Sequence, residues 1–433
     1  MSEFKLKIDK AAAEEIVSIS KNYVNLIDPI GTTGSKSEDR HQFNKDYARI
    51  LYSSSFRRLQ GKMQFLSVAS NQFYRNRLTH SHEVSQIART IASGLKRTIK
   101  SHGITDFDLF NKGMNVIEAI SLAHDIGNPP FGHAGEFQLN ELMKGKGGYE
   151  GNAQTFRVLN KLERRYPNKD GLFLSKRTLL GVVKYIYKNN ESEKFLYDSD
   201  CDLVNKIAGE SKIQLRTLDA QIMDVSDEIA YAAHDLEDAL RSKLFTIDEL
   251  LFEFKNSDKY NSVYNVLNEM VDGCKKIAQT STSISSEDYT YFFTKELTSA
   301  IVDKLVRDIG YVEISEADRK KTNTLCKKEI NYTSLELLAE GLKKINFQCL
   351  IKSPNVIIYE ANGKKIIKGL FDLLNDSPIN KKGLLLPPEY RQLIESGETK
   401  ERVICDYISG MMDTYSTELY LKYFGKGSLD SII

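Results

Sequence analysis

Apolar residues recur along this chain mostly at three- and four-residue spacing, which is the period of an amphipathic α-helix. The clearest stripe predicts a helix over about residues 79–100 and consists of Leu78, Val84, Ile87, Ala88, Ile91 and Leu95. Similar stripes predict further helices, over residues 46–60, 116–124, 136–143, 153–165, 177–188, 215–241, 291–307, 334–347 and 402–424. The pattern therefore predicts an all-α fold.

Strand-like alternation is scarce. The best candidates are residues 355–360 and 365–368, which would form a small hairpin around Asn362-Gly363. Glycine, proline and small polar residues predict three loops, over residues 28–43, 144–148 and 279–286. Helical patterning continues on both sides of the last loop, so we expect a subdomain seam there and not a linker.

Composition narrows the class of protein. The 433 residues are 41% hydrophobic and 27% charged, values that are ordinary for a folded globular protein. The 60 basic and 59 acidic residues leave a net charge of +1, so any phosphate-binding site must be local. The five cysteines form no CxxC pair, which favours reduced thiols and a cytoplasmic location. Because the N-terminus is charged and no uncharged apolar run reaches about 18 residues, we expect neither secretion nor a membrane span.

One His-Asp dipeptide carries candidate metal chemistry. His124 and Asp125 stand at the end of an apolar helix, directly before the breaker Gly127-Asn128-Pro129-Pro130, so their side chains emerge where the backbone leaves the core. Imidazole nitrogen with carboxylate oxygen suits Mn²⁺, Fe²⁺, Co²⁺ or Mg²⁺, whereas a thiolate-free site is weak evidence for structural zinc. Taken alone, the pair is more often a core histidine beside a helix-end cap.

The surrounding motifs change that balance. The order of His80, His124-Asp125 and Asp227 on three predicted helices resembles that of the HD metal-dependent phosphohydrolase superfamily. Longer stretches are similar to the bacterial dGTPase-type deoxynucleoside triphosphate triphosphohydrolases, namely SFRRLQ at 55–60, THS at 79–81, HDIGNPPFGHAGE at 124–136, EGNAQ at 150–154 and DEIAY at 227–231. The resemblance spans about residues 46 to 424. The run at 124–136 is specific to this family rather than to HD proteins at large.

The resemblance implies an HD-domain helical fold with a C-terminal helical extension. Residues 1–43 would be an N-terminal arm and residues 44–245 the HD catalytic core. Residues 246–433 would form a helical portion that closes the site and supports oligomer contacts. Four residues would hold a divalent ion, Mn²⁺, Mg²⁺ or Co²⁺: His80, His124, Asp125 and Asp227. Asp224, three residues before Asp227, is a rival for the last place.

His133 and Glu136 would be the catalytic pair. At i,i+3 on a new helix they can share one face, so Glu136 can hold the imidazole while His133 exchanges a proton at the reacting bond. Whether His133 acts as acid or base stays open. The competing reading is a histidine bonded to a nearby carboxylate with no catalytic role.

Sugar recognition is implied by one helix. Asp227, Tyr231 and Asp235 follow at i, i+4 and i+8 and so share a face. In the resembled family the tyrosine packs against C2′ of the deoxyribose and the aspartate bonds the 3′-hydroxyl; spacing alone would more often indicate rim and solvent residues. Gln64 matches a second sugar contact, although Met63 and Phe65 depart from the family's usual Thr and Val.

Triphosphate recognition requires cations. The candidates are Arg57, Arg58, Lys62, Arg75, Arg77, Lys184 and Arg402. Lys184-Tyr185 matches a family phosphate-binding pair most directly, and any single arginine could instead be a solvated side chain. Residues 402–413 resemble the family's closing motif, with Met412 where Thr is common.

The expected reaction is metal-dependent hydrolysis of a dNTP, dGTP foremost, to deoxynucleoside and inorganic triphosphate. The family also implies homo-oligomers, hexamers among them, and a dNTP effector or single-stranded DNA as a further partner. Two alternatives remain: an HD phosphohydrolase acting on another nucleotide ester, and a nucleotide- or nucleic-acid-binding regulator with a vestigial site. Base preference, the physiological metal and an effector site are left open.

Overall fold

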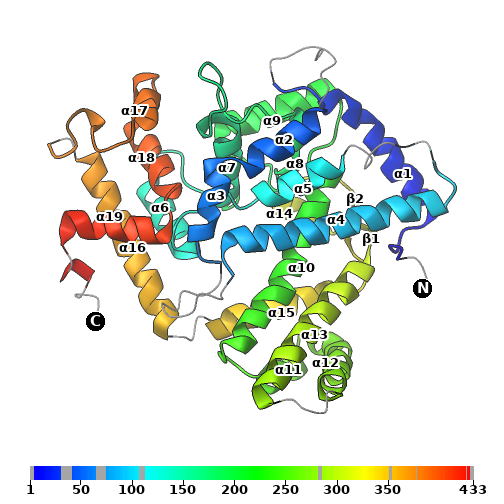
Figure 1. Ribbon diagram of the computed structural model, residues 1–433. Helices are drawn as coiled ribbons and strands as arrows, with labels where there is room; N and C mark the ends of the chain where they lie inside the picture. The colour runs from blue at the N-terminus through cyan, green and yellow to red at the C-terminus, as the bar shows by residue number, and fades with distance from the viewer. Residues whose placement is uncertain are drawn as a thin grey trace.

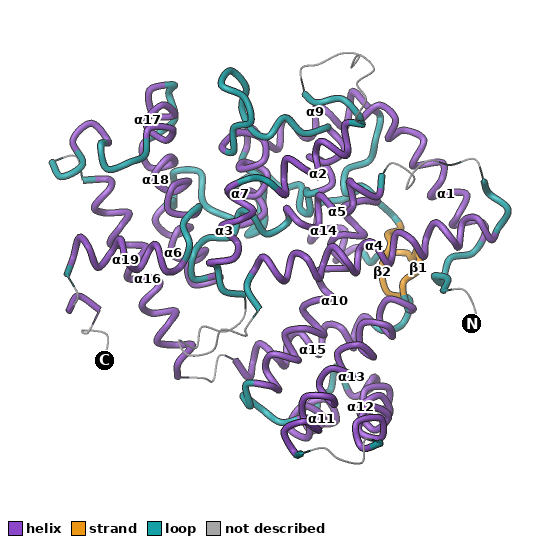
Figure 2. Tube along the Cα trace, in the orientation of Figure 1, coloured by secondary structure: helices purple, strands orange, loops and turns teal. Residues whose placement is uncertain are grey.

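The computed structural model describes residues 4–30, 41–64, 75–105, 107, 113–280, 285–350, 354–376, 378–425 and 427–429. Within these residues the chain forms 19 α-helices and one two-stranded sheet (Figures 1 and 2). The first ten helices are α1 (Lys10–Lys21), α2 (Gln42–Leu51), α3 (Ser54–Arg58), α4 (Arg77–Ser101), α5 (Met114–Ala123), α6 (Gly132–Leu142), α7 (Gly151–Arg157), α8 (Lys176–Gly181), α9 (Asp198–Ser211) and α10 (Leu218–Arg241). The mostly helical expectation is confirmed.

The second half of the chain is also helical. Its helices are α11 (Ile247–Asn256), α12 (Tyr264–Gln279), α13 (Ser286–Arg307), α14 (Glu316–Thr322), α15 (Glu336–Leu350), α16 (Pro354–Asn375), α17 (Pro388–Glu395), α18 (Lys400–Ser409) and α19 (Asp413–Phe424). The antiparallel strands β1 (Ile309–Glu313) and β2 (Lys328–Tyr332) pair with Ile309 opposite Tyr332. No described helix is both long and apolar enough to cross a bilayer.

Two long helices form the frame of the molecule. In Figure 1, α4 and α10 cross near the centre; α4 packs on α5, and α10 packs on α4, α13 and α15. A capping box starts α4: the Asn76 side chain accepts from Thr79 N, and the Thr79 hydroxyl accepts from Asn76 N. Both helices therefore lie at the centre of the packing.

Buried apolar side chains form two main clusters. The larger one runs through α1, α2, α4, α5 and α10 and continues into α11–α13 and α15. The smaller one joins α6 to α16 and α18, through Leu139, Ile367, Phe371, Ile404 and Ile408. Consequently α6, which begins directly after the 124–131 segment, packs against C-terminal helices.

The predicted hairpin around Asn362-Gly363 is wrong, because residues 354–375 form the continuous helix α16. Its apolar positions Ile366, Ile367 and Leu370 are buried at helical spacing. Gly363 serves close packing and not a turn, since a Cβ there would lie 2.6 Å from Phe131 Cβ.

Several predicted helices are confirmed but shorter or divided. The stretch 177–188 is helical only to Gly181, and the stretches 46–60 and 402–424 are each broken into two helices. The predicted turn at 144–148 is present. In the other two predicted loops, residues 31–40 and 281–284 lie outside the described residues.

Candidate active site

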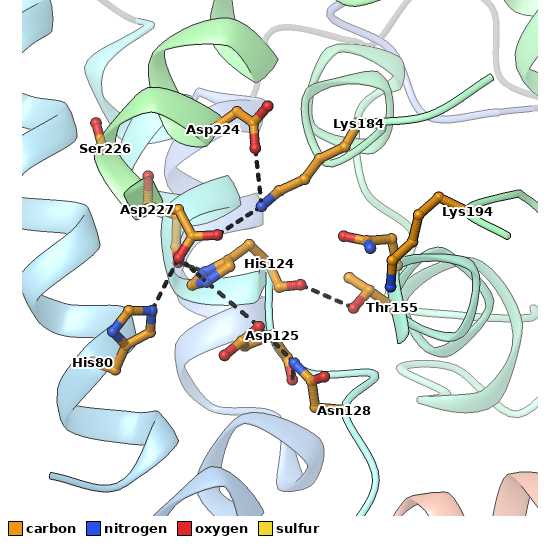
Figure 3. Close-up of polar contacts among 12 residues, drawn as sticks. His80, His124, Asp125, Asn128, Thr155, Lys184, Lys194, Asp224, Ser226 and Asp227 are labelled. Carbon is orange, nitrogen blue, oxygen red and sulfur yellow. Dashed lines mark hydrogen bonds and ion pairs between the residues drawn. The ribbon is translucent and has the colours of Figure 1, made fainter. Parts of the chain in front are cut away.

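Three helices bring two imidazoles and two carboxylates together (Figure 3). His80 comes from α4, His124 and Asp125 follow the last turn of α5, and Asp227 comes from α10. Asp227 Oδ1 lies 3.0 Å from His80 Nε2 and 3.3 Å from His124 Nε2. Ligand atoms of His80, His124 and Asp125 all lie within 4.8 Å of one another. All four side chains are buried, so the cluster is shielded from bulk water.

Local structure fixes the orientation of His124. Its Nδ1 lies 2.7 Å from the Ser121 carbonyl oxygen, and the Thr155 hydroxyl donates to the His124 carbonyl. Gly127 permits this close approach, because a Cβ there would lie 2.1 Å from Thr155 N. With Nδ1–H donating to Ser121, the remaining nitrogen is an acceptor.

The donor set fits a cation. His124 Nε2 faces Asp125 and Asp227, at 3.5 and 3.3 Å, so three acceptors converge and require a positive charge between them. Burial favours the neutral imidazole, but the two carboxylates outweigh it and raise the pKa of His124. Two nitrogen and two oxygen donors suit a divalent transition metal or Mg²⁺, and ligating histidines are commonly held by such a backbone bond.

The carboxylates are held ionised. Burial alone would raise the pKa of Asp125, but His124 and Arg77 outweigh it and lower that pKa to about 2. Arg77 Nη1 bonds Asp125 Oδ2 at 2.6 Å. Burial is likewise outweighed at Asp227, where Lys184 and His124 lower the pKa well below its usual range. Both aspartates are thus available as anionic ligands at neutral pH.

Asp224 does not contact the histidine pair within the described structure. Its carboxylate bonds Arg216 at 2.9 Å and lies 3.2 Å from Lys184 Nζ. Lys184 also bonds Asp227 Oδ2 at 2.7 Å, as Figure 3 shows. The structure therefore groups Asp227 with the histidines and gives Asp224 a place beside the lysine.

His133 and Glu136 lie together at the start of α6. His133 Nδ1 is 3.5 Å from Glu136 Oε2, and the His133 side chain is 76% exposed, so its ring is free to meet a substrate. Glu136 Oε1 accepts from Gly151 N at 3.1 Å and from Lys194 Nζ at 3.2 Å. Burial would raise the pKa of Glu136, but these contacts and His133 lower it to about 2.

Two adjoining cavities open beside these residues. One of about 240 Å³ is lined by His124, Asp125, Asp227, Lys184 and Tyr185. The other, of about 700 Å³, is lined by Gln64, Asp235, Phe131 and Tyr359. We call them the metal-side cavity and the nucleoside-side cavity. They share walls formed by Arg77, His133, Glu228, Tyr231, Asp318, Lys321, Glu336 and Lys343.

The predicted sugar contacts all face the nucleoside-side cavity. Both amide atoms of Gln64 and Asp235 Oδ1 are buried and have no hydrogen-bond partner within the described chain. Burial and the charge of Asp238 raise the pKa of Asp235 well above its usual range, so this carboxyl can donate as well as accept. The Tyr231 ring lies 4.8 Å from the His80 ring, between the metal ligands and Asp235. Phe65 lies outside the described residues.

Some predicted phosphate-binding residues lie elsewhere. Arg57 is exposed and lines neither cavity. Arg402 is buried 4.2 Å from the Tyr197 ring centroid and donates to the Gly148 carbonyl at 2.6 Å. Arg75 is ion-paired with Glu83, Glu237 and Asp238. Arg58 and Lys62 line a separate groove beside α17–α19.

Sequence reasoning missed several residues that line the cavities: Asn128, Lys194, Glu228, Lys321, Glu336, Lys343 and Tyr359. Lys194 bridges Glu136 and Glu150, at 3.2 and 2.8 Å. Lys343 Nζ lies 5.0 Å from the Tyr231 ring centroid. Of these residues, only Asn128 and Glu228 lie inside the family motifs at 124–136 and 227–231, and membership of a motif was the one signal in the sequence that could have identified them.

Comparisons with known proteins find similarity over most of the chain. The HD domain model matches residues 77–232 and the phosphohydrolase-associated domain model matches residues 333–422. A deoxyguanosinetriphosphate triphosphohydrolase-like protein 2 from Vibrio cholerae is 43% identical over 426 residues, which covers 96% of this chain and 98% of the relative. A deoxyguanosinetriphosphate triphosphohydrolase-like protein from Shewanella sediminis is 33% identical over 432 residues, with coverage of 90% and 93%.

Proposed function

The chain belongs to the HD-domain family of deoxyguanosinetriphosphate triphosphohydrolase-like proteins, and on that premise we propose that it hydrolyses dNTPs, dGTP among them, to deoxynucleoside and inorganic triphosphate. One observation carries the proposal. A buried His/His/Asp group borders the metal-side cavity, and this cavity shares walls with the nucleoside-side cavity, where polar atoms of Gln64 and Asp235 have no partner in the described chain. An HD enzyme for a small phosphate ester would not need that second cavity.

The metal site supports hydrolysis at a phosphorus atom. His80, His124 and Asp125 would hold the divalent ion together with Asp227, whose Oδ1 lies beside both imidazoles, and Mn²⁺, Mg²⁺ and Co²⁺ all suit this donor set. When bound, the ion supplies charge stabilisation of a phosphoryl oxygen. Lys184 and Tyr185, which line the same cavity, would hold the phosphates next to it.

His133 would carry out proton transfer at the scissile bond. Water attacks the α-phosphorus and loses a proton, the bond to the 5′-oxygen breaks, and that oxygen gains a proton; His133 would accept the first proton or donate the second. Glu136 faces His133 Nδ1 and, being ionised, favours the proton on that nitrogen, which directs Nε2 to the reacting oxygen. Lys194 and Gly151 hold Glu136 in place.

Sugar recognition follows along α10. Tyr231 would pack against C2′ and exclude a 2′-hydroxyl, while Asp235 would bond the 3′-hydroxyl with Gln64 beside it. Buried polar groups that lack a partner in the free protein make such a pocket selective, since a ligand that leaves them unpaired is penalised.

The test is an assay of the purified chain with each dNTP, each NTP and dGMP, after chelation and with Mn²⁺, Mg²⁺ or Co²⁺ added back. Ion chromatography separates triphosphate, pyrophosphate and orthophosphate. We expect triphosphate from dNTPs only with metal present. Orthophosphate from dGMP would favour the nucleotide-ester alternative, and tight nucleotide binding without any product would favour the regulator.

We extend the proposal to assembly and effectors in the family's terms: a homo-oligomer, hexamers being among the sizes that the resembled family forms, and a dNTP or single-stranded DNA as effector. Sedimentation velocity measures the first. Turnover of one dNTP in the presence of a second dNTP or of an oligonucleotide measures the other.

A further inference from the structure

Asp413, the first residue of α19, ties together three separate parts of the chain. Its buried carboxylate accepts from Met63 N at 3.0 Å, from Phe131 N at 3.0 Å and from the Tyr359 hydroxyl at 2.7 Å. These donors are far apart in sequence. A single side chain thus fixes their mutual positions.

All three donors line the nucleoside-side cavity, whereas Asp413 does not. Met63 directly precedes Gln64, and Phe131 is two residues before His133. Tyr359 comes from α16. The carboxylate therefore sits behind the cavity wall and holds the backbone that presents the sugar-facing amide and the catalytic histidine.

The backbone at Phe131 needs such support. Phe131 has φ 63° and the next residue, Gly132, has φ 56°, so two consecutive residues adopt the left-handed conformation directly before His133. A left-handed phenylalanine persists only where its surroundings hold it. Phe131 is also the N-cap of α6 and makes no side-chain capping bond, which leaves the bond from its N–H to Asp413 as a fixed point of the turn.

A second tie joins the same segments. Lys62 is buried, and its Nζ donates to the carbonyls of Asn128 and Ser409. Ser409 ends α18, four residues before Asp413. Bonds made by two buried side chains therefore join the corner between α18 and α19 to the turn that precedes His133.

We propose that Asp413 is a positioning residue for the reaction, through which the C-terminal helices set the sugar-facing wall and the turn that carries His133. The proposal rests on the proposed function for its kinetic consequence. It predicts that losing the carboxylate changes which sugar is accepted, in addition to how fast the substrate reacts.

The test compares Asp413→Ala with Asp46→Ala. Asp46 is an equally buried carboxylate that accepts from Ser175 N at 2.9 Å, Thr178 Oγ1 at 2.7 Å and Gln42 Nε2 at 2.7 Å. None of these four residues lines either cavity. Both variants lose stability, but only Asp413→Ala should disturb the site.

Two readouts separate positioning from folding. The ratio of kcat/KM for dGTP to that for GTP does not depend on the fraction of folded enzyme. Asp413→Ala should lower it by about tenfold and lower kcat by about 10- to 100-fold, as expected for a small misplacement of reacting groups. Hydrogen exchange of peptides covering residues 61–64 and 129–136 should accelerate in Asp413→Ala and stay unchanged in Asp46→Ala.

The outcomes are distinct. An unchanged sugar ratio with unchanged exchange in Asp413→Ala overturns the positioning role, even if activity falls. If that variant does not fold, Tyr359→Phe removes one of the three bonds and should lower the dGTP-to-GTP ratio by a smaller factor. An unchanged ratio in Tyr359→Phe would likewise overturn the positioning role. A wild type that releases no triphosphate refutes the proposed function, and the exchange data then still decide whether Asp413 holds the turn.

Discussion

The proposed metal site and the nucleoside-side cavity differ in which of their buried polar atoms lack a partner. At the proposed metal site, Arg77 bonds Asp125, Lys184 bonds Asp227, and the Ser121 carbonyl bonds His124. At the cavity, Gln64 and Asp235 keep buried polar atoms without partners in the described chain. In the first region the carboxylates already have partners, whereas imidazole nitrogens of His80 and His124 have none in the described chain, as a cation site requires. In the second region the atoms without a partner would, in the proposed function, be paired by substrate.

This difference separates two kinds of mutational effect. Charged groups fixed in a dry site act on the transition state, so changing them should reduce turnover for every substrate. Buried polar groups without a partner in the free protein discriminate between substrates, so changing them should alter the ratio of kcat/KM for one substrate to that for another. The predictions below test this division, beginning with the largest effect.

Replacing a metal ligand should have the largest effect. His124→Ala or Asp227→Ala removes one of four donors, and we expect loss of bound metal and a fall in turnover of more than about 100-fold for all dNTPs. Elemental analysis of the purified variants and triphosphate release measure the two quantities. Stoichiometric metal retained in both variants would contradict the ligand assignment.

Asp224→Asn is the matched control. Asp224 lies on the same helix but contacts Arg216 and Lys184. We expect it to retain metal, with weaker binding of substrate because Lys184 loses one of its two carboxylate neighbours. Metal loss in Asp224→Asn would return Asp224 to the place of the fourth ligand.

His133→Ala should have the next largest effect. The exposed ring contacts Glu136 and no metal ligand among the described residues, so metal content and melting temperature should stay unchanged. We expect kcat to fall by about 10²–10⁴-fold, the range for a general acid or base. Near-wild-type turnover would leave His133 with a structural role only, and a loss of metal would make it a ligand.

The two regions also differ in how far the sequence predicts them. The helical period predicts most helices, and the motifs at 124–136 and 227–231 single out side chains that the structure brings together. Lys194, Lys343 and Tyr359 had no local signal, because they enter the site through packing of distant segments. The hairpin prediction failed for a related reason. A glycine is needed at position 363 because the backbone packs closely against Phe131, 232 residues earlier, and not because the neighbouring residues form a turn.

Tyr231→Ala should act on selectivity. If the ring packs against C2′, its removal opens space for a 2′-hydroxyl, and the ratio of kcat/KM for dGTP to that for GTP should fall by about 10-fold or more. Tyr231→Phe keeps the ring and should keep the ratio. A competition assay of the two nucleotides on wild type and both variants measures it, and an unchanged ratio in Tyr231→Ala would remove Tyr231 from the sugar site.

Asp235→Ala should lower kcat/KM for dGTP and for GTP alike, because both nucleotides carry the 3′-hydroxyl. Its raised pKa favours a protonated carboxyl that can donate, and an amide can donate as well, so Asp235→Asn should lose less than Asp235→Ala. The same competition assay, extended to a 3′-deoxy analogue, measures this. Equal losses in the two variants would show that hydrogen bonding at this position is unimportant.

Arg57→Ala and Arg402→Ala should change catalysis least, although the sequence makes both arginines candidates for phosphate binding. Arg57 is exposed and lines neither cavity, so kcat/KM should stay within about twofold of wild type, as for a surface substitution.

Arg402 bonds the Gly148 carbonyl and the Tyr197 hydroxyl inside the C-terminal packing. Its loss should lower the melting temperature by about 2–4 °C, because buried acceptors lose a charged donor. The sugar ratio and KM for dGTP should be unchanged in both variants. A rise in KM of about tenfold in either one would place a phosphate contact outside the two cavities, and the division between the proposed metal site and the nucleoside-side cavity would then describe only part of the site.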